Sequence, residues 1–253
     1  MRGTGRETAD SGSGDLRGRV LRLADPAYAR RVRFFFKTGP GAYAENDMFA
    51  GVRVPALRAV ARAAGEPSLA RILRLLRDPV HEVRMLALLL LIRRFEAGDA
   101  ACRRRVADFY LANTRHINNW DLVDVSAAPI VGAWLWGRDT ASLDALARSP
   151  QMWERRIAIV ATHAFIRRGR FDETLRIAEA LLGDREDLLH KAAGWMLREV
   201  DKRDPRALDR FLARHRGVMP RTMLRYALEH RARRPLTPAR TRGPGARSGC
   251  ADG

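Results

Sequence analysis

The sequence predicts an all-α protein whose helices stack as an α-solenoid. Three observations indicate this fold. Apolar residues recur at helical spacing along most of the chain, hardly any segment alternates as a β-strand would, and glycine or proline interrupts the pattern at short intervals. Short connections between helices of about 10–18 residues are typical of antiparallel helical pairs.

The individual helices follow from periodicity and from their end signals. Pro55 and Pro79 suit the first turn of a helix, where the missing N–H of proline has no intrahelical bond to lose. The apolar residues from Leu69 to Leu76 have the spacing of an amphipathic helix. Further helices are expected over residues 25–36, 55–64, 79–96, 100–113, 119–136, 140–147, 151–168, 171–182, 186–202, 205–215 and 219–232.

A helical repeat runs through this region. Arg84, Trp120, Arg156 and Lys191 each lie near the start of a long apolar segment, at spacings of 36, 36 and 35 residues. A helical unit that repeats at about this length is the mark of an α-solenoid. Stacked units would place these four residues along one concave face, where the three cations Arg84, Arg156 and Lys191 form a basic track for DNA.

The two ends of the chain differ in composition from the helical region. Residues 1–18 are rich in glycine and serine and predict a disordered N-terminal tail. Residues 233–253 combine arginine with proline and glycine and predict a disordered basic C-terminal tail. Residues 19–232 are expected to form the helical-repeat domain.

Composition narrows the class of partner. A formal net charge of +18 at pH 7 indicates a polyanion, and nucleic acid is the leading candidate for a helical protein. No apolar run reaches the ~20 residues that cross a bilayer, so no membrane is expected. Cys102 and Cys250 predict no structural disulfide, which favours the cytoplasm and, on DNA, the nucleoid. No histidine has metal-ligand spacing to cysteine or glutamate, so we expect no metal.

The segment Asn118–Asp124 combines an aromatic ring with a carboxylate. Trp120 and Asp124 are four residues apart at the start of a predicted helix and therefore share one face. Such a pair suits a cationic sugar or an alkylated base, because both groups attract positive charge. Alternatively, Asp124 forms an ion pair with an arginine such as Arg156. The residues themselves leave both interpretations open.

Three other residues are candidates for the same surface. Trp195 could hold a sugar or base by stacking, although a tryptophan in a helical protein is usually part of the core. Arg156 begins an apolar helix whose N-terminus attracts phosphate, although it is one of many arginines. Tyr43 follows a tight turn at Gly39–Gly41 and could press its ring against a duplex.

Taken together, these segments are similar to the DNA alkylation repair glycosylases of the AlkD-like family. The resemblance covers about residues 25–230, and its motifs have the family's order and spacing. The matching stretches are Tyr43–Pro55, Asn118–Asp124, Trp153–Val160, Lys191–Glu199 and Met219–Leu228.

The resemblance implies a solenoid of HEAT-like repeats that holds duplex DNA in its concave face. It also implies a monofunctional glycosylase that hydrolyses the glycosidic bond of cationic N3- and N7-alkylated purines, without base flipping, metal or cofactor. Asp124 would match the essential carboxylate, Trp120 and Trp195 the tryptophans around the lesion's sugar, Arg156 the DNA-backbone arginine and Tyr43 the aromatic residue of the first loop. A monomer suffices to grip one duplex.

Two other functions remain open. A non-catalytic DNA-binding module would use the same basic surface but release no base. A helical-repeat scaffold for protein partners would bind DNA with little dependence on salt, whereas several phosphate contacts predict a steep dependence.

Overall fold

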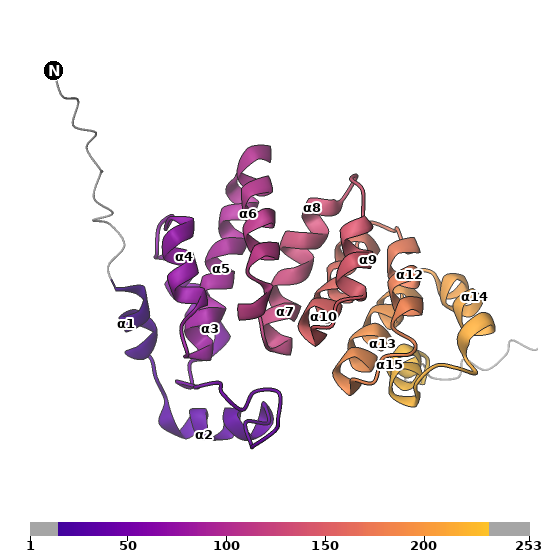
Figure 1. The fold of residues 1–253 in the computed structure, drawn as a ribbon, viewed down its shortest axis with the longest axis horizontal. Coiled ribbons are helices and arrows are strands. Elements are labelled where there is room, and N and C mark those ends of the chain that lie inside the picture. Colours follow the sequence, from indigo (N-terminus) through magenta and orange to yellow (C-terminus); the bar gives the residue numbers. More distant parts are fainter. Residues whose placement is uncertain (1–14, 233–253) are drawn as a thin grey trace, which may run out of the picture.

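A computed structural model describes residues 15–232, which form helices joined by mostly short connections, with a longer loop over residues 36–53 (Figure 1). Within this range the predicted all-α fold is confirmed: the helices from α3 to α14 follow one another in a row, and α2 lies below that row. They are α1 (Leu16–Leu21), α2 (Pro26–Phe35), α3 (Val54–Arg62), α4 (Leu69–Leu76), α5 (His81–Ala97), α6 (Ala100–Ala112), α7 (Trp120–Ala127), α8 (Ala133–Leu135), α9 (Ala141–Ala147), α10 (Met152–Ala161), α11 (His163–Ile166), α12 (Asp172–Ala180), α13 (Asp187–Asp201), α14 (Pro205–His215) and α15 (Arg221–Ala232).

Local signals explain several of the helix starts. Asp25 caps α2 by accepting hydrogen bonds from the N–H groups of Ala27 and Tyr28, and Pro26 follows as the first helical residue. Pro55 lies in the first turn of α3, as predicted. The prediction for Pro79 is wrong, because α5 begins at His81. The carbonyl of Pro79 instead accepts a hydrogen bond from the N–H of Met48, so a short bridge occupies this segment before the helix starts.

Two of the predicted helices are interrupted. The expected helix 119–136 consists of α7, a π-helical turn at Ala128–Gly132 and α8. Pro129 lies in that turn and has no N–H to donate, which favours the change of hydrogen-bond pattern. Gly132 lets α10 approach closely, because a Cβ there would lie 2.1 Å from the carbonyl oxygen of Ala161. The expected helix 151–168 is divided at Thr162, whose hydroxyl bonds the carbonyl of Ile159.

A continuous apolar core joins the repeats. The long helices α5, α7, α10 and α13 contact one another in that order, and α13 also packs against α15. Their buried faces include Leu88 on α5, Ile159 on α10 and Leu197 on α13, all with no measurable exposure. Because each helix buries apolar residues against the next, the row is one rigid support for side chains at the helix starts.

The repeat register differs from the predicted one. Counted from the helix starts, Arg84 is the fourth residue of α5 and Trp120 is the first of α7, whereas Arg156 and Lys191 are each the fifth of their helix. The predicted anchors are therefore not equivalent. The fifth residues of the four helices are Met85, Asp124, Arg156 and Lys191.

Hydrogen bonding supports the corrected register. The Nη1 atom of Arg84 donates to the carbonyls of Asp78 and Pro79 at 3.0 and 3.1 Å. Arg155 makes the same pair of bonds, to the carbonyls five and six residues before it, at 3.0 and 2.9 Å. Arg84 therefore corresponds to Arg155 and not to Arg156.

The helical domain also begins earlier than the predicted boundary at residue 19. Residues 16–18, predicted as part of a disordered tail, belong to α1, where Leu16 is buried and Asp15 caps the helix. Residues 1–14 of the predicted N-terminal tail and the predicted C-terminal tail, 233–253, lie outside the described residues. Among the described helices, none combines the length and the apolar character needed to cross a membrane.

Candidate functional site

A cleft of about 620 Å³ lies where the first turns of α7, α10 and α13 meet. It brings together six of the seven predicted site residues, and Arg84 is the exception. Several residues that the sequence did not suggest complete the lining. The six are Tyr43, Trp120, Asp124, Arg156, Lys191 and Trp195, and the others include Phe35, Lys37, Met152, Glu186, Asp187, Leu188, Arg198 and Tyr226.

Helix position explains why these side chains meet. The first residues of the three helices, Trp120, Met152 and Asp187, form one row in the cleft, and the fifth residues, Asp124, Arg156 and Lys191, form a second. Residues four apart on a helix share a face, so the two rows run in parallel across the stacked helices. Counting from the helix starts would have identified Met152 and Asp187 from the sequence.

Asp124 and Arg156 form a bidentate ion pair across α7 and α10. The Nε atom of Arg156 donates to Oδ1 of Asp124 at 2.9 Å, and Nη2 donates to Oδ2 at 2.8 Å. The third nitrogen, Nη1, donates to the carbonyl of Leu188 on α13. Burial raises the pKa of Asp124 above its ordinary value, and the guanidinium opposes this rise. The pairing that the sequence left open is therefore present.

The carboxylate nevertheless keeps an open side. The Asp124 side chain is 19% exposed and lines the cleft, whereas the Arg156 side chain is only 6% exposed. Arg156 is thus better placed to orient Asp124 and join three helices than to reach out to a phosphate. Bidentate geometry fixes the plane of a carboxylate more firmly than a single contact does.

Trp120 is held by rings from the loop that follows α2. Its indole stacks on Phe36 with a centroid distance of 5.2 Å and an interplanar angle of 19°. Phe36 in turn stacks on Phe49, and Phe49 stacks on His81 at 4.7 Å. The side chain of Asn119 accepts a hydrogen bond from the N–H of Trp120 and starts α7. Trp120 is therefore a fixed wall of the cleft, not a mobile surface ring.

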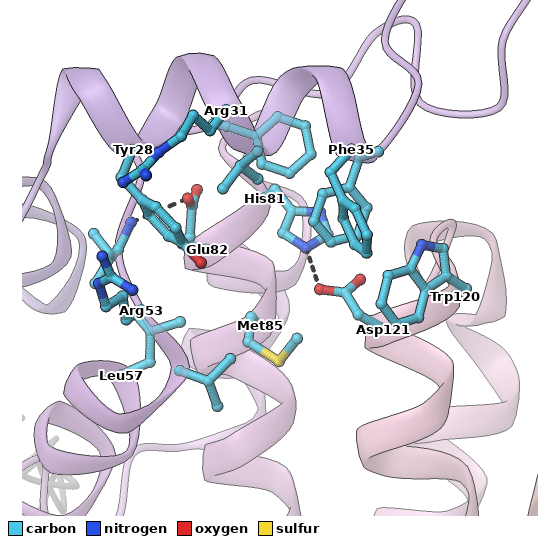
Figure 2. A pocket seen from close by; sticks show the side chains of 15 residues that line it. Tyr28, Arg31, Phe35, Arg53, Leu57, His81, Glu82, Met85, Trp120 and Asp121 are labelled. Carbon is cyan, nitrogen blue, oxygen red and sulfur yellow. Dashed lines mark hydrogen bonds and ion pairs between the residues drawn. The ribbon is translucent and has the colours of Figure 1, made fainter.

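A buried polar cluster ties that loop to the helix starts. His81 contacts Asp121 through Nε2 at 2.8 Å (Figure 2) and Asp47 through Nδ1 at 3.3 Å. Asp47 also accepts hydrogen bonds from Arg84 at 2.6 Å and from the side chain of Asn119 at 3.1 Å. Burial by itself would lower the pKa of His81, but the hydrogen bonds to Asp121 and Asp47 outweigh it and raise that pKa to about 9. This cluster could not be predicted from local sequence patterns, because its members are far apart along the chain.

Arg84, predicted to bind DNA, has a different role. Arg84 is 5% exposed, and its guanidinium donates hydrogen bonds to the Asp47 carboxylate and to the carbonyls of Asp78 and Pro79. A buried arginine with these partners holds the loop in place and does not face a phosphate.

Tyr43, Lys191 and Trp195 occupy other parts of the cleft. The half-buried ring of Tyr43 lies edge-on to Trp153 at 5.8 Å, and burial raises the pKa of its hydroxyl. Lys191 pairs with Asp187 at 2.7 Å within α13. Trp195 is partly buried, with one ring contact to His163 at 5.9 Å.

A second hollow of about 490 Å³ also reaches Asp124. Four exposed arginines line it, from α3, α5 and the segment after α11, and His163 lies among them. Glu96 is also part of the lining, so positive charge predominates at this approach to the carboxylate. The four are Arg58, Arg62, Arg93 and Arg167.

Comparisons with known proteins indicate a DNA alkylation repair protein. A family model described as "DNA alkylation repair enzyme" matches residues 17–230. The fold is similar to a structure described as a predicted DNA alkylation repair enzyme from Enterococcus faecalis, with a TM-score of 0.65 and 17% identity, over 84% of this chain and 98% of that one. It is also similar to AlkD2 from Streptococcus mutans, with a TM-score of 0.50 and 16% identity, over 85% and 98%. No curated protein matches.

Proposed function

The chain belongs to the DNA alkylation repair enzyme family, and we propose that it is a monofunctional glycosylase that releases cationic N3- and N7-alkylated purines from duplex DNA. The observation that carries this proposal is the position of Asp124. It is a largely buried carboxylate at the wall of a cleft that also contains the indoles of Trp120 and Trp195. The structural neighbours share little sequence identity with this chain, so their likeness supports the fold alone. The reaction is therefore argued from these side chains.

The cleft suits a sugar that becomes positively charged. When the C1′–N9 bond of an N7-alkylguanosine breaks, both electrons of the bond stay with the base, which leaves as a neutral molecule. Positive charge then develops on the deoxyribose, where a carboxylate stabilises it at short range. Indole faces add further attraction for a cation.

Water completes the reaction. Its oxygen forms the new bond to C1′, and the proton that it loses passes to Asp124 or to solvent. An alkylated purine is already a good leaving group, so the proposed reaction needs no second carboxylate as a general acid. We assign Asp124 to charge stabilisation and to positioning of this water, and Trp120 and Trp195 to holding the sugar.

Arg156 is a positioning residue in this mechanism. Its two bonds to Asp124 fix the plane of the carboxylate, and its third bond fixes the distance to α13. The pair lowers the net charge at the site, but the open side of Asp124 still faces the cleft.

The duplex is expected on the side that carries both the cleft and the arginine-lined hollow. Arg58, Arg62, Arg93 and Arg167 would contact phosphates there, and Lys37 and Lys191 would do so at the cleft. This basic face, the monomeric state and attack without base flipping are parts of the proposal.

The test is release of free base from a duplex with a single N7-methylguanine, compared between the wild type and Asp124→Asn. Asp108→Asn is a matched control, because Asp108 is an exposed aspartate on α6 that does not line the cleft. Release by the wild type and the control, but not by Asp124→Asn, supports the proposal. Duplex binding without release by any of the three proteins would show that the mechanism is wrong.

One observation favours a second candidate function. Each oxygen of the Asp124 carboxylate accepts a hydrogen bond from Arg156, as it would in a purely structural ion pair. A non-catalytic DNA-binding protein would keep this pair for stability. In that case Asp124→Asn lowers the free energy of unfolding, and no variant releases base.

A further inference from the structure

Two phenylalanines project from the end of α2 into solvent. Phe34 is 91% exposed and Phe35 is 65% exposed, and both belong to the small set of large apolar side chains on the surface of the described residues. An isolated exposed apolar residue is ordinary, but two adjacent phenylalanines at a helix end form a patch that is costly to leave in water.

The backbone under this pair is held firmly. The next residue, Phe36, is buried and stacks on Trp120. Lys37 then adopts a left-handed conformation with a φ of 53°, which is uncommon for a residue other than glycine. Two backbone bonds close the helix end, from Lys37 N–H to the carbonyl of Phe34 and from Thr38 N–H to that of Arg33, both at 3.3 Å. The two rings therefore extend from a rigid base.

The end of α2 that carries Phe34 and Phe35, here called the tip, borders the cleft directly. Phe35 and Lys37 both line it, together with Trp120 and Asp124. The Phe35 ring lies edge-on to Trp120 with a centroid distance of 5.8 Å, and Figure 2 shows the two rings side by side. Whatever occupies the cleft therefore meets Phe35, and the exposed ring of Phe34 precedes it on the same helix end.

The charged residues next to the two phenylalanines along the chain are all positive, whereas the carboxylates nearby, among them Asp124 and Asp187, lie inside the cleft. Arg30, Arg31, Arg33 and Lys37 are exposed, and the sequence has no acidic residue between Asp25 and Glu45. An apolar tip surrounded by cations fits a ligand that presents flat apolar surfaces inside an anionic frame. A base step between two phosphate backbones has that chemistry.

We propose that Phe34 and Phe35 form a wedge that enters the duplex beside the cleft and unstacks a base step, while the surrounding cations hold the phosphates. Apolar side chains that part base steps in this way kink the DNA and widen its contact with the protein. The inference rests on the proposed function for the presence of duplex DNA. It adds a contact that neither Asp124 nor the two cleft tryptophans supply.

The experiment compares the wild type with Phe34→Ala, Phe34→Leu and Val218→Ala, all as the full chain. The probe is a duplex with one tetrahydrofuran abasic analogue flanked by 2-aminopurine, whose fluorescence rises when its base unstacks. Phe34 suits the test because a side chain that is 91% exposed contributes little to folding. Val218, 69% exposed between α14 and α15, controls for the loss of an exposed apolar residue away from the cleft.

We expect Phe34→Ala to lose most of the fluorescence rise and about tenfold in duplex affinity, as is typical when one ring that stacks on a base is removed. Phe34→Leu should keep much of both, and Val218→Ala should keep all of both. The slope of log affinity against log salt should stay unchanged in Phe34→Ala, because the phosphate contacts remain.

The wedge and the proposed reaction fail in different ways. If Phe34→Ala binds and unstacks the probe like the wild type, the wedge is wrong, whether or not base is released. A second outcome would also overturn the wedge. If the wild type binds vesicles of anionic lipid, and Phe34→Ala loses this binding but keeps its duplex binding, the two phenylalanines contact a membrane instead. If the wild type unstacks the probe but releases no N7-methylguanine, the wedge stands and the glycosylase mechanism is wrong.

Discussion

Asp124 on α7 and Arg156 on α10 are joined by two nearly parallel hydrogen bonds of 2.9 and 2.8 Å. The pair spans two neighbouring helices, and the third guanidinium nitrogen extends the link to the carbonyl of Leu188 on α13. One arginine thereby sets both the orientation of the carboxylate and the spacing of the helices that form the cleft.

Replacing Arg156 tests this double role. Arg156→Lys keeps the charge but cannot form the two parallel bonds, so we expect base release to fall about 10-fold or more, with a smaller loss of stability than in Arg156→Ala. Removing one partner of a buried pair costs roughly 3–5 kcal/mol, and the partial exposure of Asp124 reduces that to about 1–3 kcal/mol. Base release and urea unfolding of both variants measure the two effects. Equal activity in wild type and Arg156→Lys would show that bidentate geometry does not matter.

The His81 cluster predicts how stability depends on pH. The pKa of His81 is about 9 in the folded protein and about 6.5 when unfolded. Its contribution is therefore complete below pH 6.5 and is lost as the pH rises through 9, by roughly 3 kcal/mol at most. Urea unfolding at pH 6 and pH 9.5 should show this fall in the wild type and a smaller one in His81→Gln. The same fall in both proteins would assign it to other groups.

Gly132 predicts a packing limit between α10 and the π-helical turn. A methyl group there would meet the carbonyl oxygen of Ala161 at 2.1 Å and Cβ of Ala164 at 2.8 Å, so the helices must separate. Gly132→Ala should lower the free energy of unfolding by about 1–3 kcal/mol. Gly183→Ala is the control, because no atom lies within 4 Å of its added Cβ. Equal stabilities of the two variants would contradict this account of the packing.

Variants of Arg84 and Arg93, which lie on the same helix, distinguish an effect on folding from an effect on DNA binding. Arg93 is exposed beside the hollow that reaches Asp124, so Arg93→Ala should weaken duplex binding and reduce the salt slope by about one. Arg84→Ala should leave the slope unchanged and lower stability by about 1–3 kcal/mol, since Asp47 loses a buried partner. Titrations at several salt concentrations and urea unfolding distinguish the two. A reduced slope in Arg84→Ala would restore it as a DNA contact.

The helices were predictable because their signals are local. Apolar spacing, first-turn prolines and glycine breaks identified nearly every helix, and the spacing of Trp120 and Asp124 placed both on one face of α7. Boundaries were less certain where a distant partner competes, as at Pro79, which bridges to Met48 before α5 begins. Equal spacing along the chain also failed as a guide to register, because the connections between repeats differ in length.

Tertiary packing decided which of these side chains act together. Asp124 meets Arg156 because α7 lies against α10, Trp120 is fixed by Phe36 from a loop more than eighty positions earlier, and Arg84 is buried by Asp47. Helix periodicity sets which face a residue occupies, but the partner on that face depends on how the helices stack. The sequence by itself therefore determined the elements and the candidate carboxylate, and the packed core decided the carboxylate's orientation, the walls of its cleft and which arginines remain exposed around it.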